Sequence, residues 1–574
     1  MKNGPMKHAL RVVVVAALVA AAACGSLPVS HGVHRVRAVA ANAQQDTNVR
    51  LIPPPPQPGD GPTGIVAGFL RAAASDVERA RQFLVADASW SSDAPIRVYN
   101  EAALAPKLVK TTPATAEHVP ASTVAVRMTP VATLDPSGAL VPTAGSALTL
   151  TFTLAELPGV GWRITVPPPG VALSVSDLAS RAQIPLTFFA PTGDVTVRTP
   201  VLLDPGADLL TTAVDALLSA QPSGLRTYVP AGTALNDVSV SSSTIVVDLT
   251  PSAARVSPTD LPKLGAQLAA TLLPLEPDAT GVRIDVSGRP LEGSDRYTSS
   301  DVDQYDAELA TATDGPVVVT TSGARLVGAP STGPADGGEP TAVAFSDDGH
   351  RVAWVRSRRV VVAPVSALAT ATAVTGTGSW RSLSWGRDGS LWLVRDDGGA
   401  GGNVSVLAPG ASAPAPAAPP PGLAGLVTEL RIARDGVDAT LVAGGVLSDA
   451  TIGEEATGPV LRDVVPVARG LTQVAVVTAR GGDGALLAYG TFQRRPGLWH
   501  VATEISAELL TDPFVVTSVR APCTGSGAPT ALAQPGGDGN ASDLAVCDGR
   551  LRLRQVDGSW SDAGPADGAA WPGG

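Results

Sequence analysis

The sequence predicts a multidomain protein of α+β and all-β class, in which two smaller mixed domains precede a large β-domain. The chain has 574 residues, which is enough for about four domains of ordinary size. In its first half, apolar residues recur at helical spacing and then alternate along strands, whereas its second half repeats an Asp-Gly turn motif. The predicted boundaries are 1–23 for a signal peptide, 24–62 for a tether, 63–175 for a cone-like α+β domain, 180–292 for an α/β domain, 293–312 for a linker and 313–571 for a β-propeller.

The first 24 residues predict export and attachment to a membrane. Lys2 and Lys7 precede the apolar run 12–23, which is too short to span a bilayer but has the length of a signal-peptide core. The small residues directly before Cys24 resemble a bacterial lipobox, although Ala21 stands where lipoboxes usually have Leu. The resemblance implies that Cys24 becomes the first mature residue and carries S-diacylglycerol and an N-acyl chain such as palmitate. Ordinary cleavage beside an unmodified Cys24 is the alternative.

The tether and the two remaining cysteines fit a location outside the cytoplasm. Prolines cluster at 53–56, which favours an extended spacer that holds the following domains away from the membrane. Cys523 and Cys547 form an even pair that could close one disulfide in an oxidising compartment. Two reduced, buried thiols are the alternative.

The composition and the motifs argue against several classes of function. The net charge is −11 and no basic stripe occurs, so a nucleic-acid partner is not expected. The six histidines lack metal-ligand spacing, and neither a nucleophile elbow nor a phosphate-binding loop is present. The sequence therefore predicts a protein without catalytic residues, metal or cofactor.

Residues 63–175 predict helices followed by an antiparallel sheet. Ile65, Val66 and Phe69 share one helical face, and alternating strands follow until 162–166. This order resembles the nuclear-transport-factor-like cone fold. The resemblance implies a binding pocket, but no paired carboxylate or histidine offers chemistry for it.

Residues 180–292 predict an α/β domain with strands at 184–189, 245–249 and 282–286 and a helix at 209–218. The segment from Tyr228 to Leu249 and the closing Val282-Arg-Ile-Asp-Val with Gly288-Arg-Pro-Leu resemble the GerMN domain of envelope and sporulation proteins. The resemblance implies binding or assembly at the cell wall and brings no catalytic residues.

The linker at 293–312 is acidic, with Asp301, Asp303 and Asp306 among its residues. Such a cluster could hold Ca²⁺, but the spacing lacks the Gly and the bidentate Glu of an EF-hand. A solvated linker is therefore expected.

Residues 313–571 contain an internal repeat of strand, Asp-Gly turn and strand. Its glycines at 349, 389, 436 and 484 are 40, 47 and 48 residues apart, which is the size of a four-stranded propeller blade. The segment has room for about six blades, with 414–421 as a loop between two of them; a β-sandwich is the alternative. Asp347, Asp348 and Asp388 occupy turn positions of the repeat and are therefore interpreted as turn residues rather than as paired catalytic carboxylates.

The order of lipobox, Pro-rich tether, cone-like domain, GerMN-like domain and propeller resembles the LpqB family of actinobacterial lipoproteins along nearly the whole chain. The resemblance implies a non-catalytic accessory protein on the outer face of the cytoplasmic membrane. Its implied partner is the ectodomain of an MtrB-type sensor histidine kinase, and its implied role is in cell division and envelope homeostasis. A wall- or glycan-binding lipoprotein that uses peptidoglycan as its partner is one alternative, and a hydrolase in the propeller channel is another.

Overall fold

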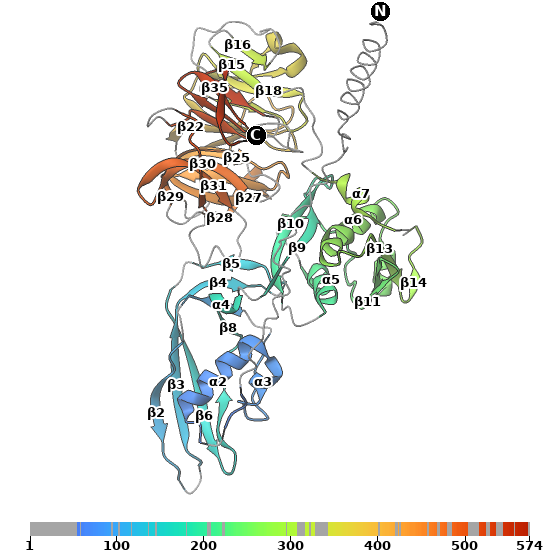
Figure 1. The fold of residues 1–574 in the computed structure, drawn as a ribbon, viewed down its shortest axis with the longest axis vertical. Coiled ribbons are helices and arrows are strands. Elements are labelled where there is room, and N and C mark those ends of the chain that lie inside the picture. The colour runs from blue at the N-terminus through green and yellow to red at the C-terminus, as the bar shows by residue number, and fades with distance from the viewer. Residues whose placement is uncertain are drawn as a thin grey trace, which may run out of the picture. The chain divides into compact units, whose positions relative to one another are not determined.

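The computed structural model describes residues 54–571 except 58, 93–95, 101–103, 116–117, 136, 144–145, 179–180, 204–207, 221–223, 294–295, 307–315, 321–322, 328–341, 400–401, 419–422, 424–425, 456–457, 468–470, 479–484, 503–515, 524–527, 535–542 and 556 (Figure 1). The chain divides into the units 1–49 and 50–574, and everything described below lies in the second. None of the described helices is long and apolar enough to cross a bilayer.

The first domain begins with two helices and continues with two four-stranded sheets. Its helices are α2 (Pro62–Ser75), α3 (Val77–Arg81) and the short α4 (Val175–Leu178). Its sheets have the orders β2-β3-β6-β7 and β5-β4-β1-β8. The strands are β1 (Ile96–Tyr99), β2 (Lys107–Thr112), β3 (Ala121–Met128), β4 (Pro130–Leu134), β5 (Leu140–Pro142), β6 (Leu148–Leu157), β7 (Gly161–Val166) and β8 (Ala172–Ser174).

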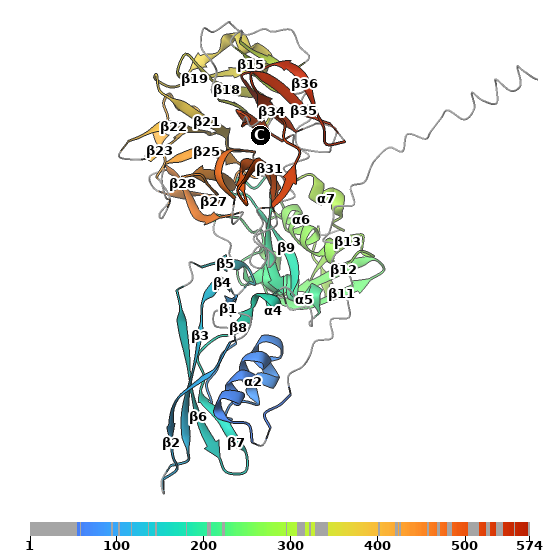
Figure 2. The same cartoon turned by 60° about the vertical axis from the view of Figure 1, so that its left-hand side comes forward.

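Helix α2 covers one face of the longer sheet (Figure 2). Pro62 suits its first turn because that position needs no backbone donor. Its apolar face carries Phe69 into the core, where the ring meets Trp90 and Phe152 edge to face at centroid distances of 5.1 and 5.9 Å. Trp90 donates its indole N–H to the carbonyl oxygen of Gly170 at 3.2 Å. Aromatic side chains thus fill the space between α2 and the sheet.

The second domain combines a hairpin, a four-stranded sheet and two main helices. The sheet has the order β11-β12-β13-β14 with β12 and β13 parallel, and the hairpin is β9-β10. Helices α5 and α6 bury Val214, Leu217, Leu264 and Leu268 in a common core with these strands. The elements are β9 (Ala182–Phe189), β10 (Thr196–Leu203), α5 (Leu209–Ser219), β11 (Leu235–Ser241), β12 (Thr244–Leu249), η1 (Pro251–Arg255), α6 (Leu261–Leu272), η2 (Leu273–Leu275), β13 (Gly281–Val286) and β14 (Arg289–Pro290).

The segment expected to be a solvated linker contains a helix that belongs to the second domain. Helix α7 (Ser299–Asp303) buries Val302, and Tyr297 before it is also buried in the domain core. Asp301 accepts hydrogen bonds from the backbone N–H of Thr298 at 2.7 Å and from its hydroxyl at 2.9 Å. The expectation of a linker over this stretch was wrong, because the carboxylate caps a helix.

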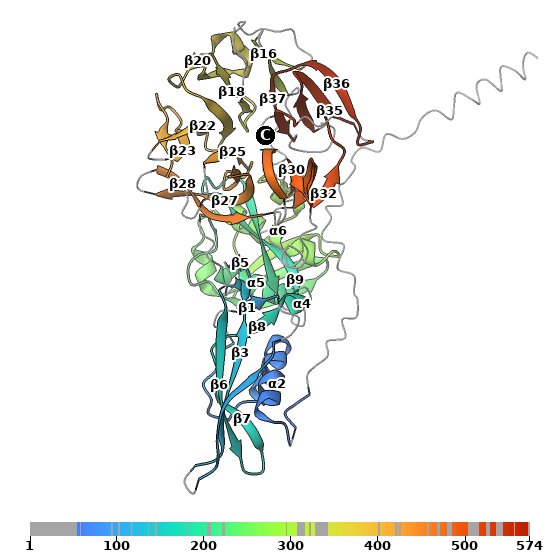
Figure 3. The same cartoon turned by 90° about the vertical axis from the view of Figure 1, so that its left-hand side faces the viewer.

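The C-terminal region is built from sheets that follow one another around a common centre (Figure 3). The described strands form one three-stranded sheet, β16-β15-β37, and five four-stranded sheets that each use consecutive strands from β17 to β36. The strands are β15 (Val317–Thr320), β16 (Gly323–Leu326), β17 (Val343–Phe345), β18 (Arg351–Arg356), β19 (Arg359–Pro364), β20 (Thr372–Ala373), β21 (Trp380–Trp385), β22 (Leu391–Gly399), β23 (Gly402–Leu407), β24 (Ala415–Pro416), β25 (Val427–Ile432), β26 (Asp438–Ala443), β27 (Val446–Glu455), β28 (Gly458–Pro466), β29 (Leu471–Val477), β30 (Ala485–Phe492), β31 (Arg495–Ala502), β32 (Val516–Val519), β33 (Ala531–Ala533), β34 (Leu544–Cys547), β35 (Arg550–Arg554), β36 (Trp560–Pro565) and β37 (Gly568–Ala570), and η3 (Val365–Thr370) precedes β20.

These sheets close into a ring. The strands β17, β21, β25, β29 and β33 each contact the next, and β37 contacts both β33 and β17. Strand β15 from the start of the region pairs with β37 from its end, so one sheet joins both ends. This arrangement is a β-propeller. The expected number of about six blades stays a prediction, because 328–341 and 503–515 lie outside the described residues.

The stretch 414–421 is not only a loop. Ala415–Pro416 form β24, which pairs with Ser405 and Val406 at the edge of its sheet. Proline is tolerated there because an edge strand has backbone positions that need no donor. The Asp-Gly motif at 483–484 lies outside the described residues.

Candidate functional site

The cysteines singled out in the sequence have separate places. Cys24 lies outside the described residues, so its lipidation stays a prediction. Cys523 and Cys547 are joined by a disulfide with a Cα–Cα distance of 5.4 Å. Their side chains are buried among Leu487, Leu498 and other apolar residues. This bond is a structural link between β34 and the loop after β32.

The Asp-Gly turns connect the first two strands of three neighbouring sheets. In the first of them Asp348 accepts hydrogen bonds from the Ser346 hydroxyl at 2.6 Å and from the His350 backbone at 3.0 Å. In the second, Asp388 accepts from the Ser390 backbone at 2.9 Å. These two aspartates stabilise the turns locally, as the repeat predicts.

Asp347 lies in the first of these turns, but its Oδ2 is buried and makes no hydrogen bond there. Burial raises the pKa of this carboxyl to about 7, against the opposing effect of Arg434 and Arg387. The three side chains occupy the same position of successive repeats, directly before the Asp of Asp-Gly. The propeller therefore gathers one carboxyl and two guanidinium groups from three neighbouring turns.

Arg387 also links the propeller to the hairpin of the second domain. Its guanidinium contacts the carboxylate of Asp194 at 3.0 Å, and Asp194 lies between β9 and β10. Beside this pair, Val437 packs with Ala190 and Val195 of the same hairpin. Burial alone would raise the pKa of Asp194, but the hydrogen bonds from Thr192 and Arg387 outweigh burial and lower it.

A second polar group lies deeper, on the strands that form the inner ring. Glu429 and Arg431 pair at 2.7 Å and are only 6% and 8% exposed. Burial raises the pKa of Glu429 above its usual value, although Arg431 opposes this effect. Arg431 donates to the carbonyl oxygen of Leu383, and the Ser382 hydroxyl donates to that of Leu430. These contacts join one sheet to the next.

Neither polar group has the layout of a hydrolytic site. Asp347 faces two arginines, and the neighbouring carboxylate of Asp348 is engaged by hydrogen bonds within its own turn. Glu429 is paired with Arg431 in a buried position. Among the described residues, no three His, Cys, Asp or Glu side chains gather as a metal site would require. The arrangement can hold neighbouring sheets and the β9–β10 hairpin together, and it can attract anionic groups through its arginines.

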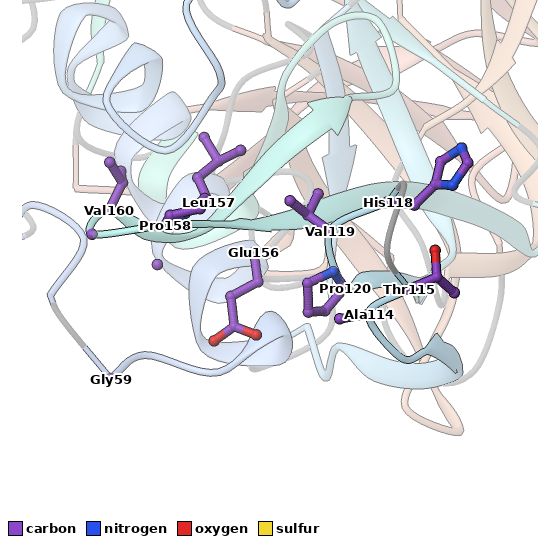
Figure 4. A pocket seen from close by; sticks show the side chains of 12 residues that line it. Gly59, Ala114, Thr115, His118, Val119, Pro120, Glu156, Leu157, Pro158 and Val160 are labelled. Carbon is purple, nitrogen blue, oxygen red and sulfur yellow. The ribbon is translucent and has the colours of Figure 1, made fainter.

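A cleft lies in the first domain, at the tips of the β2–β3 and β6–β7 hairpins. It has a volume of about 750 Å³ and is lined by Gly59, by 114–115 and 118–120, and by 156–161. Figure 4 shows Glu156 and His118 in separate parts of this lining, pointing in different directions. They do not form an acid–base pair. The resemblance to the cone fold implies a pocket in this domain, but the sequence does not place this cleft, because it forms only where two hairpin tips and the segment before α2 meet.

Comparisons with known proteins identify three regions of the chain. Residues 55–179 match the N-terminal domain of lipoprotein LpqB, residues 185–292 match a sporulation and spore germination domain named Germane, and residues 316–507 match the LpqB β-propeller domain. The first domain of the sporulation protein GerM from Bacillus subtilis is 21% identical, with coverage of 19% of this chain and 86% of that domain and a TM-score of 0.17.

Relatives with the name Lipoprotein LpqB match along most of the chain. The one from Thermobifida fusca is 29% identical over 572 residues, which cover 82% of this chain and 87% of the relative. The one from Streptomyces coelicolor is 29% identical over 488 residues, which cover 77% of this chain and 78% of the relative. Two LpqB domain models match residues 55–179 and 316–507, and relatives with the name Lipoprotein LpqB match most of the chain, so the chain belongs to the LpqB family of lipoproteins.

Proposed function

We propose that this protein is a non-catalytic lipoprotein, anchored through Cys24 on the outer face of the cytoplasmic membrane, that binds the ectodomain of an MtrB-type sensor histidine kinase. By preferring one conformation of the kinase, it modulates signalling in cell division and envelope homeostasis. The observation that carries the proposal is membership of the LpqB family together with a lipobox-like segment that ends at Cys24.

The polar chemistry of the propeller supports a binding role. The buried ion pair of Glu429 and Arg431 and the hydrogen bond of Ser382 hold adjacent sheets together, so these buried polar side chains are committed to structure. A rigid ring with loops on its rim offers a surface for a protein partner. A lipid anchor would add affinity without new contacts, because it raises the effective concentration near other membrane proteins.

The first test concerns the anchor. The variant Cys24→Ser should be released from the membrane or remain an uncleaved precursor, whereas the wild-type chain should partition with membranes and incorporate labelled fatty acid. The double variant Cys523→Ser/Cys547→Ser is the matched control, since it replaces the other two cysteines but keeps Cys24. If Cys24→Ser were still processed and membrane-bound, the anchor assignment would be wrong.

The second test concerns the kinase. The immobilised kinase ectodomain should retain the mature chain from detergent-solubilised membranes, and crosslinking in intact membranes followed by mass spectrometry should place crosslinks between the two proteins. An unrelated kinase ectodomain serves as the control bait. Absence of enrichment at every salt concentration would contradict the proposal.

The alternative is a lipoprotein that binds the cell wall, and the match of residues 185–292 to a sporulation and germination domain favours it. In that case the mature chain should sediment with purified peptidoglycan. Sedimentation with peptidoglycan and no retention by the kinase ectodomain would replace the kinase proposal with this one.

A further inference from the structure

The sheet β2-β3-β6-β7 of the first domain has one face against α2 and one face open to solvent (Figures 1 and 2). On β3 the buried residues Val124 and Val126 alternate with Thr123, Ala125 and Arg127. Because side chains on a strand alternate between faces, these last three point away from the core. The strand register then assigns the residues of the neighbouring strands to the same outer face.

Four cations occupy this outer face. Lys107 pairs with Ala125 and Lys110 with Thr123, so both lysines of β2 lie beside the outward residues of β3. Arg127 adds a third cation, and Arg163 of β7, which pairs with Ala155, adds the fourth. The lysines and Arg127 are exposed, and Arg163 is half-buried.

No carboxylate points outward from the four described strands of this face. The residues between the cations are mainly threonines, namely Thr123, Thr149, Thr151 and Thr153. Among the nearest acids, Glu156 pairs with Trp162 in the rows that face the core, and Asp60 acts electrostatically on Arg163 from beside the sheet. A basic, hydroxyl-rich face thus stands on a chain whose net charge is −11.

The length of the tether and the point where it joins the first domain indicate that the membrane is the partner of this face. The described chain enters the first domain at Pro54–Gln57 and passes Gly59, which lines the cleft at the hairpin tips of the same sheet (Figure 4). The 30 residues from Cys24 to Pro54 span at most about 100 Å when extended, so a chain anchored at Cys24 can lay this face on the membrane. Exposed Val166 on β7, which pairs with the outward Thr153, adds apolar surface at 60% exposure.

We propose that the outer face of the sheet β2-β3-β6-β7 is a docking surface for a bilayer with anionic phospholipid headgroups. The cations attract the negative surface, and the threonine hydroxyls donate hydrogen bonds to phosphate oxygens. Lysines on the edge strand β2 also oppose pairing with another β2 edge, which disfavours a second copy as the occupant. This docking does not depend on the binding of the kinase. It rests on the proposed anchor only because the anchor keeps the sheet close to the lipid surface.

The test uses the mature chain with Cys24→Ser, which lacks any acyl chain, in sedimentation with vesicles. Phosphatidylglycerol–phosphatidylcholine vesicles should bind the protein at low salt, pure phosphatidylcholine vesicles should bind it weakly, and high salt should release it. Each cation near an anionic surface raises the partition coefficient from water to the membrane roughly fivefold. The double variant Lys107→Gln/Lys110→Gln should therefore weaken binding to the vesicles on the order of twentyfold.

The matched control is Arg358→Gln/Arg359→Gln, which removes the same charge from an exposed hairpin of the propeller and should leave binding within about twofold. Equal weakening by the two pairs would show an effect of net charge alone and overturn the assignment to this face. Absence of binding to anionic vesicles at low salt would overturn it as well. Binding to a purified anionic wall polymer, together with no binding to vesicles, would also overturn the assignment. None of these outcomes bears on the retention of the chain by the kinase ectodomain.

Discussion

Two adjacent aspartates in the first propeller repeat have opposite environments. Burial alone would raise the pKa of Asp348, but hydrogen bonds from Ser346 and His350 outweigh burial and lower it. Asp347 has a buried oxygen without a hydrogen-bond partner, and burial raises its pKa to about 7 even though Arg434 and Arg387 oppose the shift. The sequence places both residues in a turn. In the structure Asp348 is held by hydrogen bonds within that turn, whereas Asp347 is buried near arginines of two neighbouring turns.

The raised pKa of Asp347 predicts a change of stability with pH. Between about pH 4 and pH 7 the unfolded chain has lost this proton while the folded chain keeps it, so rising pH destabilises the fold, by up to about 4 kcal/mol. Asp347→Asn removes this cost and should gain stability relative to wild type as the pH increases from 4.5 to 8. Thermal unfolding at both pH values measures the difference.

Asp348→Asn is the comparison for that experiment. The lowered pKa of Asp348 means that its stabilising contribution is present at neutral pH and is lost as the pH falls. The asparagine variant should therefore be destabilised most at neutral pH, which is the reverse of Asp347→Asn. Parallel pH profiles for wild type and Asp347→Asn would contradict the assignment of a raised pKa.

The turns between strands also determine how neighbouring sheets pack. Gly436 ends the Asp-Gly motif of the third turn with a positive φ of 73°. A Cβ atom at this position would lie 2.7 Å from the Cβ of Arg387 in the adjacent turn. Glycine is required both for its backbone conformation and for this close approach. Only the first requirement is visible in the sequence.

Gly436→Ala should destabilise the protein by about 3 kcal/mol, because a strained backbone and a collision with Arg387 act together. Gly410→Ala is the matched control, since Gly410 has a φ of 75° but no heavy atom within 4 Å of an added Cβ. It should cost about 1 kcal/mol. Thermal unfolding measures both variants, and equal losses would show that the contact with Arg387 contributes nothing.

The disulfide between β34 and the loop after β32 should stabilise the C-terminal region. It joins residues separated by 24 positions, so its removal should lower stability by about 3 kcal/mol. In a Cys24→Ser background, Cys523→Ser/Cys547→Ser should lower the melting temperature by roughly 10 °C. Dithiothreitol should lower it equally in the chain that keeps the pair and should not affect the double variant. An unchanged melting temperature after complete reduction would contradict a stabilising role.

For the whole molecule, the important contact is the one that closes the propeller. Val317, Val318 and Val319 of β15 pair with Ala570, Ala569 and Gly568 of β37, which lie about 250 residues later in the chain. The backbone N–H of Asp567 also donates to the carbonyl oxygen of Val319 at 2.8 Å. The last strand thus completes a sheet that the first strand of the region begins.

A chain that ends at Asp567 should lose this pairing and the burial of Ala569 and Ala570, at a cost of roughly 4 kcal/mol. We expect a lower melting temperature and faster proteolysis of the propeller. A chain that ends at Trp571 retains β37 and is the control. Equal protease resistance of the two truncated chains would show that closure does not limit stability.

The sequence by itself determined the order of the parts. Three local patterns predicted this order: the helical spacing in the first domain, the GerMN-like strand pattern and the repeat of Asp-Gly turns. Such patterns can be recognised in a sequence before the fold is known. The same reasoning missed β10, extended the linker over α7 and treated 414–421 as loop alone. Strands β10 and β24 each pair with the strand directly before them, and α7 packs into the core of the second domain, so all three are defined by contacts rather than by a local pattern.

Only the tertiary structure decided which residues meet. It paired Cys523 with Cys547, brought Asp347 beside Arg387 and Arg434 of successive repeats, and closed β15 on β37. It also aligned the four cations on one sheet face, since strand register rather than spacing along the chain makes them neighbours. These contacts depend on long-range packing, for which the sequence supplies the residues but not the geometry.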